Sequence, residues 1–108
     1  MSEFIQVFTT IDSEAGAQSL SNVLVDKRLA ACVQIIGPIT STYHWQGQVE
    51  TSREWLCLIK SEQSLYGQLE QVLKEIHPYD VPEILSLPVM DGNADYLDWI
   101  HTQLTSSR

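Results

Sequence analysis

The sequence predicts an α+β fold, in which strands and helices follow one another in the order βαββαβ and one further helix follows. Segments rich in β-branched and aromatic residues alternate with longer segments whose apolar residues recur every three or four positions. Of the 108 residues, 44% are hydrophobic and 19% are charged, which is the composition of an ordinary globular chain. Because domains of about 100–150 residues are the commonest, we expect a single domain over residues 1–108.

The first strand is expected over Phe4–Ile11, where aromatic and β-branched residues dominate. It stops at Asp12 and Ser13, both of which are favourable N-cap residues, so a helix should follow directly. That helix carries one apolar stripe and ends near Lys27, whose cation suits the negative end of the helix dipole. The residues of the stripe are Ala17, Leu20, Val23 and Leu24.

A long strand is predicted from about Cys32 to Trp45, followed by a second β-segment that runs through Ile59. Proline has no N–H to donate and glycine allows unusual dihedral angles, so Gly37-Pro38 should place a kink or bulge in the first strand. Gln46-Gly47 separates the two segments and can form a tight turn with positive φ. The two strands should therefore form a long antiparallel hairpin.

The remaining segments complete the pattern. Ser61 is expected to cap a helix that ends at His77-Pro78, a strand is expected within Val81–Pro88, and Asn93 should cap the last helix. The apolar positions of the two helices are Leu65, Leu69, Val72, Leu73 and Ile76 in the first, and Leu97, Ile100 and Leu104 in the second. This order is that of the ferredoxin-like fold, with two helices on one face of an antiparallel sheet and an additional C-terminal helix.

The length of the hairpin predicts an oligomer. At about 3.3 Å per residue, a strand from Cys32 to Trp45 spans on the order of 40 Å, whereas a domain of about 100 residues has a radius of gyration near 13 Å. The overhanging part would expose Tyr43, Trp45 and Trp55 together with open strand edges, which proteins normally cover. We expect a second subunit to cover it. In the alternative, a bend at Gly37-Pro38 folds the hairpin back onto its own sheet and leaves a monomer.

Charge and composition exclude several classes of protein. The net charge of −8 repels phosphate backbones, so we expect no nucleic-acid partner. The longest apolar runs are shorter than the roughly 18 residues needed to cross a bilayer, and the first residues lack the features of a signal peptide. We therefore expect no membrane partner, a cytoplasmic location, and reduced thiols at Cys32 and Cys57.

Two residues are candidates for binding a metal. Cys32 follows two alanines, where a cysteine can be a small buried hydrophobe or a soft thiolate ligand for copper. His77 stands at a helix end, where its ring can cap carbonyl groups or bind a metal through imidazole. Asp80 and Glu83 could add carboxylate ligands, although the spacing matches no standard zinc motif.

Other polar residues have simpler interpretations. Residues 91–95 lack the glycine position and the terminal glutamate of a calcium loop, so they form a turn and an N-cap. Cys57, His44 and His101 have no evident partner and should be structural or solvent-facing. The sequence contains no phosphate-binding glycine loop, HExxH, CxxC or GxSxG motif, which favours a protein that is not an enzyme. A small enzyme that uses His77 and Glu83 as acid and base is a further alternative.

Three stretches together resemble the CutA family of divalent-cation tolerance proteins: residues 27–33 (KRLAACV), 43–47 (YHWQG) and 77–84 (HPYDVPEI). Residues 87–89 and 95–99 are also similar to the family's ending. The resemblance implies a ferredoxin-like subunit in a homotrimer, with long hairpins paired between subunits as in PII-type signalling proteins. It also implies a link to copper or other divalent metals through two cysteines and one histidine. Cys32 and His77 match two of these positions, and Thr9 occupies the third.

The resemblance leaves two functions open. The first is a trimeric, metal-responsive binding protein without turnover or an organic cofactor. The second is a PII-like signalling module that binds a small metabolite or an unidentified partner protein at subunit clefts. Lys60, Trp45, Tyr79 and Glu83 match motif positions of the family, and a cleft lined by them could hold a small anion or metabolite.

Overall fold

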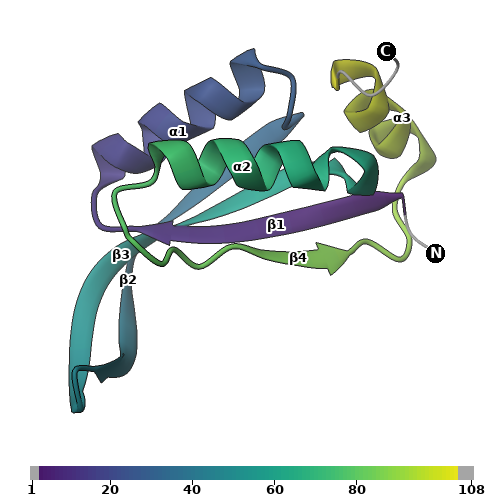
Figure 1. Ribbon diagram of the computed structural model, residues 1–108. Coiled ribbons are helices and arrows are strands. Elements are labelled where there is room, and N and C mark those ends of the chain that lie inside the picture. The colour runs from purple at the N-terminus through teal and green to yellow at the C-terminus, as the bar shows by residue number, and fades with distance from the viewer. Residues whose placement is uncertain (1–2, 105–108) are drawn as a thin grey trace.

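A computed structural model describes residues 3–104 and contains one four-stranded antiparallel sheet with strand order β2-β3-β1-β4 (Figure 1). This order and the helices between the strands confirm the predicted α+β, ferredoxin-like arrangement. The strands are β1 (Phe4–Ile11), β2 (Cys32–Trp45), β3 (Gln48–Glu62) and β4 (Leu85–Pro88). The helices are α1 (Glu14–Asp26), α2 (Tyr66–Ile76) and α3 (Ala94–Gln103), with a 3-10 turn, η1 (Gln63–Leu65), before α2. Within residues 3–104, none of the helices is long and apolar enough to cross a membrane.

The first and last helices begin as the sequence predicts. The Ser13 hydroxyl accepts a hydrogen bond from the Gly16 N–H at 3.0 Å, and the Asn93 side chain accepts one from Tyr96 N–H at 3.0 Å. Beyond the end of α1, Arg28 adopts a left-handed conformation with φ of 59°. Its guanidinium donates to the Gln103 carbonyl at 3.0 Å, which ties the end of α1 to α3.

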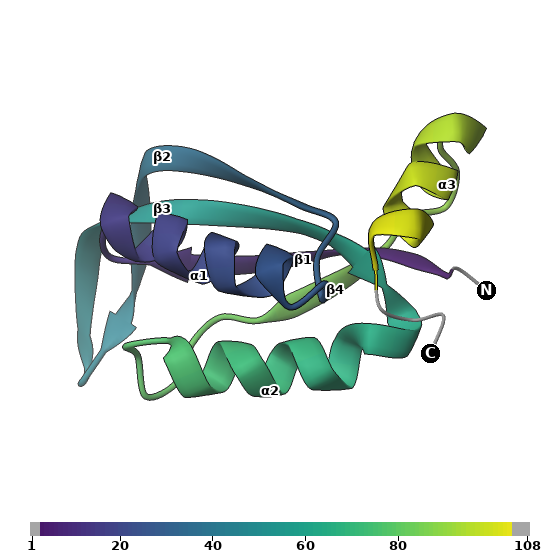
Figure 2. The same ribbon diagram turned by 90° about the horizontal axis from the view of Figure 1, so that it is seen from above.

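The main core lies between the sheet and the two helices α1 and α2, which cover the same face (Figures 1 and 2). Alternate residues of β1 point into this core, because successive side chains of a strand face opposite sides of the sheet. The fully buried contributors include Val7 and Ile59 from the sheet and Leu24, Leu69 and Leu73 from the helices. A smaller cluster around Leu65, Ile100 and Leu104 attaches α3 to the body.

The other side of the sheet, which we call the open face, is covered by neither α1 nor α2 (Figure 1). It is formed by the alternate set of strand residues, and several of these are apolar and solvent-exposed. Ile36 is 48% exposed, Leu85 58% and Leu87 51%. Exposed apolar residues on a sheet face of this kind are normally covered by another surface.

The long hairpin is confirmed and projects beyond the body of the subunit. β2 and β3 pair as far as Trp45↔Gln48, whereas β1 stops at Ile11↔Trp55. The pairing register shifts between Ile36 and Ile39, which places the predicted bulge at Gly37-Pro38. From there the hairpin turns away from the helices, toward the side of the open face (Figure 1), and it does not fold back onto its own sheet. The chain is therefore elongated, with extents of 45 × 25 × 22 Å.

One sequence-based boundary was wrong, and one predicted segment proves to be only partly strand. Ser61 does not cap α2, because β3 continues through it: Ser61 pairs with Ile5 and its hydroxyl donates to the Leu29 carbonyl at 2.7 Å. The fourth strand comprises only Leu85–Pro88, and Val81 lies in a loop and is 89% exposed. Sheet pairing with β1 therefore decides both boundaries, and local propensity does not.

We predict that Gly37→Ala destabilises the root of the hairpin. A Cβ atom at Gly37 would lie 2.3 Å from Cδ1 of the Trp55 indole, so the ring or the strand must shift. Overpacking of this kind typically costs about 1–3 kcal/mol. The measurement is the free energy of unfolding in urea.

Gly67→Ala is the matched control. Nothing lies within 4 Å of a Cβ added at this position in α2, so alanine should stabilise the protein by about 0.5–1 kcal/mol. Wild-type stability in Gly37→Ala would show that Trp55 does not hold the hairpin root.

Candidate functional site

The ring of His77 is buried and held at both nitrogens by backbone groups. His77 follows the last residue of α2, and only 7% of it is exposed. Its Nε2 lies 2.8 Å from the Thr10 carbonyl oxygen. Because a carbonyl can only accept, Nε2 carries the proton and donates it. Nδ1 then has the lone pair, and it accepts a hydrogen bond from the Tyr79 N–H at 3.2 Å.

Tyr79 connects the same loop to the root of the hairpin. Its hydroxyl donates to Glu54 Oε2 at 2.7 Å, and Glu54 is buried on β3 opposite Ile39, next to the register shift. The rings of His77 and Tyr79 are also in contact, with centroids 4.7 Å apart. Burial, the bond to Glu54 and the negative charges of Glu54 and Asp12 all raise the pKa of Tyr79 well above its usual value. The phenol therefore stays protonated and remains a donor.

Cys32 lies at the other end of the sheet. It is the first residue of β2 and faces Lys60 across β3, and Lys60 in turn faces Gln6 on β1. His77 instead reaches β1 at Thr10, four residues further along that strand. At about 3.3 Å per residue this separates the two rows by about 13 Å. One chain therefore does not bring the two candidate metal ligands together.

Thr9, at the third family position, lies in the core. It is fully buried beside Cys57, its cross-strand neighbour, and its hydroxyl has no hydrogen-bond partner within the described residues. Burial raises the pKa of the Cys57 thiol to about 11, so this cysteine remains a neutral thiol. Cys32 and Cys57 are both free, as the sequence predicts.

The residues expected to line a small-molecule cleft are also dispersed within one chain. Lys60 is bonded to glutamine side chains on the open face, whereas Tyr79 is bonded to Glu54 at the hairpin root. Trp45 lies at the far end of the hairpin and is 60% exposed. Glu83 is exposed in the loop before β4. In the part of the chain that the structure describes, no three His, Cys, Asp or Glu residues are grouped so that they could hold a metal ion.

The expectation that His101 has no partner was wrong. Its Nδ1 lies 2.5 Å from Oε2 of the buried Glu62, and this hydrogen bond and the charge of Glu62 raise the pKa of His101. The pair attaches α3 to the end of β3. Its members are 39 positions apart in the sequence, so no local pattern could reveal it.

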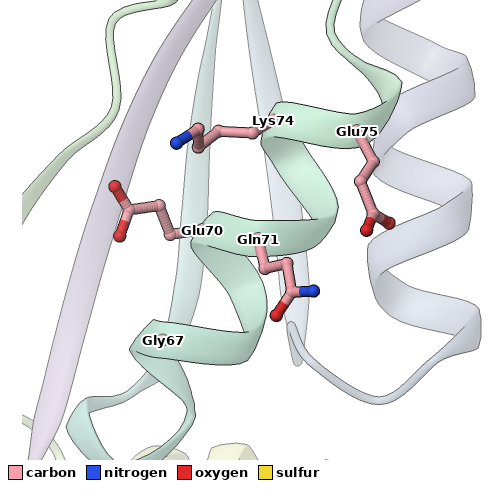
Figure 3. A pocket seen from close by; sticks show the side chains of 5 residues that line it. All are labelled: Gly67, Glu70, Gln71, Lys74 and Glu75. Atoms are coloured by element: carbon pink, nitrogen blue, oxygen red, sulfur yellow. The ribbon is translucent and has the colours of Figure 1, made fainter.

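The concave surface of about 360 Å³ along α2 is remote from these residues. Figure 3 shows its side chains: Glu70 and Lys74 point to one side of the helix, whereas Gln71 and Glu75 point to the other. These side chains carry charges of both signs and point away from one another, so they do not converge on a ligand. We do not regard this surface as a functional site.

Three polar residues of these arrangements were not predicted from the sequence. Glu54 binds Tyr79, and Gln6 and Gln34 bind Lys60. Each of them is a polar residue inside a β-segment. A polar side chain at a buried or half-buried position needs a hydrogen-bond partner, and this could have revealed them. The identity of that partner depends on strand register, which the sequence did not specify.

Comparison with known proteins assigns the family. The model of the family described as CutA1 divalent ion tolerance protein matches residues 5–103, and the chain belongs to this family. A protein named divalent-cation tolerance protein CutA from Thermus thermophilus is 45% identical over 94 residues, covering 87% of this chain and 91% of that protein. A mouse protein named CutA is 44% identical over 100 residues, and the match spans 93% of this chain but only 56% of the mouse protein.

Solved structures agree with this assignment. The crystal structure of CutA from Xylella fastidiosa superposes with a TM-score of 0.93 at 38% identity, covering 95% of this chain and 99% of that chain. The crystal structure of CutA1 from Oryza sativa gives a TM-score of 0.93 at 37% identity, covering 95% and 94%. The long hairpin, the ferredoxin-like sheet and the terminal helix are therefore family features.

We predict that Tyr79→Phe destabilises the subunit by about 1–3 kcal/mol, because it leaves the buried Glu54 carboxylate without its donor. The raised pKa adds a dependence on pH. The stability difference from wild type should be constant between about pH 7 and pH 10, where unfolded tyrosine is protonated. Above that pH it should shrink as the pH rises toward the raised pKa of the folded state.

The measurement is urea unfolding as a function of pH. Tyr96→Phe is the control, since it keeps the stacking on Trp99 and removes a hydroxyl that forms no hydrogen bond within the described residues. This variant should stay within about 0.5 kcal/mol of wild type. Equal effects of the two substitutions would exclude a structural role for the bond to Glu54.

Proposed function

We propose that this protein acts in divalent-cation tolerance as a cytoplasmic homotrimer that binds a metal ion without turnover. We further propose that His77 of one subunit and Cys32 of a neighbouring subunit contact the ion, which is copper or another divalent metal. Membership of a family described by ion tolerance, and not by a reaction, supports the binding role. The two free thiols suit a reducing compartment.

The observation on which the metal assignment rests is the orientation of the His77 ring. Histidines that bind metals usually donate their second ring N–H to a carbonyl or a carboxylate, which fixes the tautomer and directs the other nitrogen. Here Nε2 donates to the Thr10 carbonyl and Nδ1 holds the lone pair, with only a 3.2 Å hydrogen bond from Tyr79 N–H to displace. Within the described residues no hydrogen bond joins the buried His77 to the exposed Glu83, so the structure gives no support to an acid–base pair of these two residues.

Cys32 is the soft ligand in this proposal. Thiolate and imidazole together suit copper and related ions, whereas the hydroxyl of Thr9 does not complete a soft three-ligand set. Cys32 begins β2 on the side of the open face and is half-buried, while Cys57 is enclosed in the core. Because Cys32 and His77 occupy opposite ends of one subunit, an ion can bridge them only where two subunits meet.

Two uncovered parts of the chain support the proposed assembly. The open face exposes Ile36, Leu85 and Leu87, and the hairpin exposes Trp45 and Val49. The hairpin turns toward the side of the open face, so both surfaces can be covered by the same neighbour (Figure 1). Burial of such surfaces drives association, and the trimeric arrangement is the one that the family resemblance implies.

We predict that sedimentation at micromolar concentration gives a single species of three times the 12.2 kDa chain mass. Leu87→Lys should shift this species toward smaller masses, because it places a charge in an apolar interface. Val81→Lys, which changes an equally apolar residue in an exposed loop, should leave the mass unchanged. A wild-type species of one chain mass would refute the assembly.

We predict that calorimetric titration of the trimer with Cu²⁺ and Zn²⁺ shows a saturable site that weakens about tenfold or more in Cys32→Ser and in His77→Gln. Glutamine keeps an N–H donor for the Thr10 carbonyl and removes the Nδ1 lone pair, so folding should be retained. The controls are Cys57→Ala and His44→Ala, which remove a buried thiol and a hairpin imidazole. Wild-type affinity in both test variants would exclude the assigned ligands.

One observation favours the second candidate function, a PII-like module that binds a small metabolite. Lys60 lies on the open face without an acidic partner in the described chain, bonded only to two glutamine side chains. A cation in this position is suited to binding a small metabolite. It cannot be a ligand of a soft metal ion.

A further inference from the structure

The open face contains one cation surrounded by apolar and amide side chains. Lys60 Nζ donates to Gln6 Oε1 and, at 3.1 Å, to Gln34 Oε1. Within residues 3–104 no carboxylate forms an ion pair with Lys60, and the nearby Glu62 is bonded to His101 instead. The positive charge of Lys60 is therefore solvated by amide dipoles and is not neutralised by the described chain.

The unused hydrogen-bonding groups of these three side chains are mainly donors. An ammonium has three N–H donors and no acceptor, so both glutamines must turn their amide oxygens toward Lys60. Their NH₂ groups then remain available, and so does the third N–H of Lys60. None of these donors has a recorded hydrogen-bond partner in the described residues. What the group lacks is an acceptor, and because it is cationic the best acceptor is an anion.

The surroundings of the group would strengthen such an interaction. On the same face, Leu87 flanks Gln6, and Leu58 lies opposite Gln34. When a neighbouring subunit covers this apolar surface, the local dielectric constant falls and an unpaired ammonium becomes costly. A bound oxyanion would remove that cost and would form charge-assisted hydrogen bonds.

We propose that Lys60, Gln6 and Gln34 form a binding site for a small molecule that carries a carboxylate or phosphate group, at a boundary between subunits. The proposal rests on the assembly proposed above and gives the metabolite-binding alternative a ligand class. The net charge of −8 repels anions at long range, so binding depends on the short-range donors of this group.

The test is thermal unfolding in increasing inorganic phosphate or succinate, with ionic strength held constant by chloride. The proteins are the wild type, Lys60→Gln and Lys74→Gln, the last of which removes an exposed lysine on the outer surface of α2. Phosphate also stabilises proteins in general by exclusion from their surfaces, and this effect should be equal in all three. We expect at least one probe to give an additional, saturable rise in melting temperature in the wild type and in Lys74→Gln.

In Lys60→Gln this additional rise in melting temperature should disappear. Gln34→Leu keeps the charge of Lys60 but removes one amide group, so the apparent affinity for the probe should weaken about tenfold. Equal responses in Lys60→Gln and the wild type would overturn the proposal. The absence of a saturable response to both probes would also overturn it. If Lys60→Gln dissociates the trimer in addition, Lys60 pairs with a carboxylate of a neighbouring copy and not with a bound anion. Sedimentation of the wild-type samples separates the two failures: a wild-type trimer without a response refutes the oxyanion site alone, whereas a wild-type monomer refutes the assembly.

Discussion

The two helices α1 and α2 cover only one face of the sheet, and much of the rest of the molecule depends on this one-sided covering. The covered face supplies the core, with Leu24, Leu69 and Leu73 packed against the inward residues of β1 and β3. The other face is left uncovered by the helices, and it combines exposed leucines and an isoleucine with the Lys60 group. Both the proposed assembly and the proposed ligand site depend on this face.

The hairpin extends the same principle beyond the sheet. Past Ile11, β1 no longer pairs with β3, so the distal parts of β2 and β3 have only each other as partners. An isolated two-stranded hairpin is marginally stable in water, so its root must be held firmly and its surface covered. The Trp55 indole packs against Gly37 at that root, and Glu54 accepts the hydrogen bond of Tyr79 beside it. The loop after α2 therefore holds the hairpin in position.

This arrangement gives the loop after α2 a structural role, and a metal site is the second role that we propose for it. His77 and Tyr79 anchor the loop to β1 and β3 through buried hydrogen bonds, which is a sufficient structural reason for their presence. The bond to the Thr10 carbonyl also orients the imidazole as metal-binding histidines are oriented. A substitution at His77 therefore changes both the fold and any metal site, and only variants that preserve the bond to Thr10 separate the two.

The sequence by itself determined the order of elements, the caps at Ser13 and Asn93, the bulge at Gly37-Pro38 and the family, because each depends on residues close together in the chain. Tertiary structure alone decided which distant side chains meet. Strand register placed Lys60 between Gln6 and Gln34, although they are 54 and 26 positions away. The same register placed Cys32 at the opposite end of the sheet from His77, whereas the family motif suggests a single site. Local chemistry specifies elements and their ends, but a site is made by pairings between strands, and periodicity and propensity do not encode these pairings.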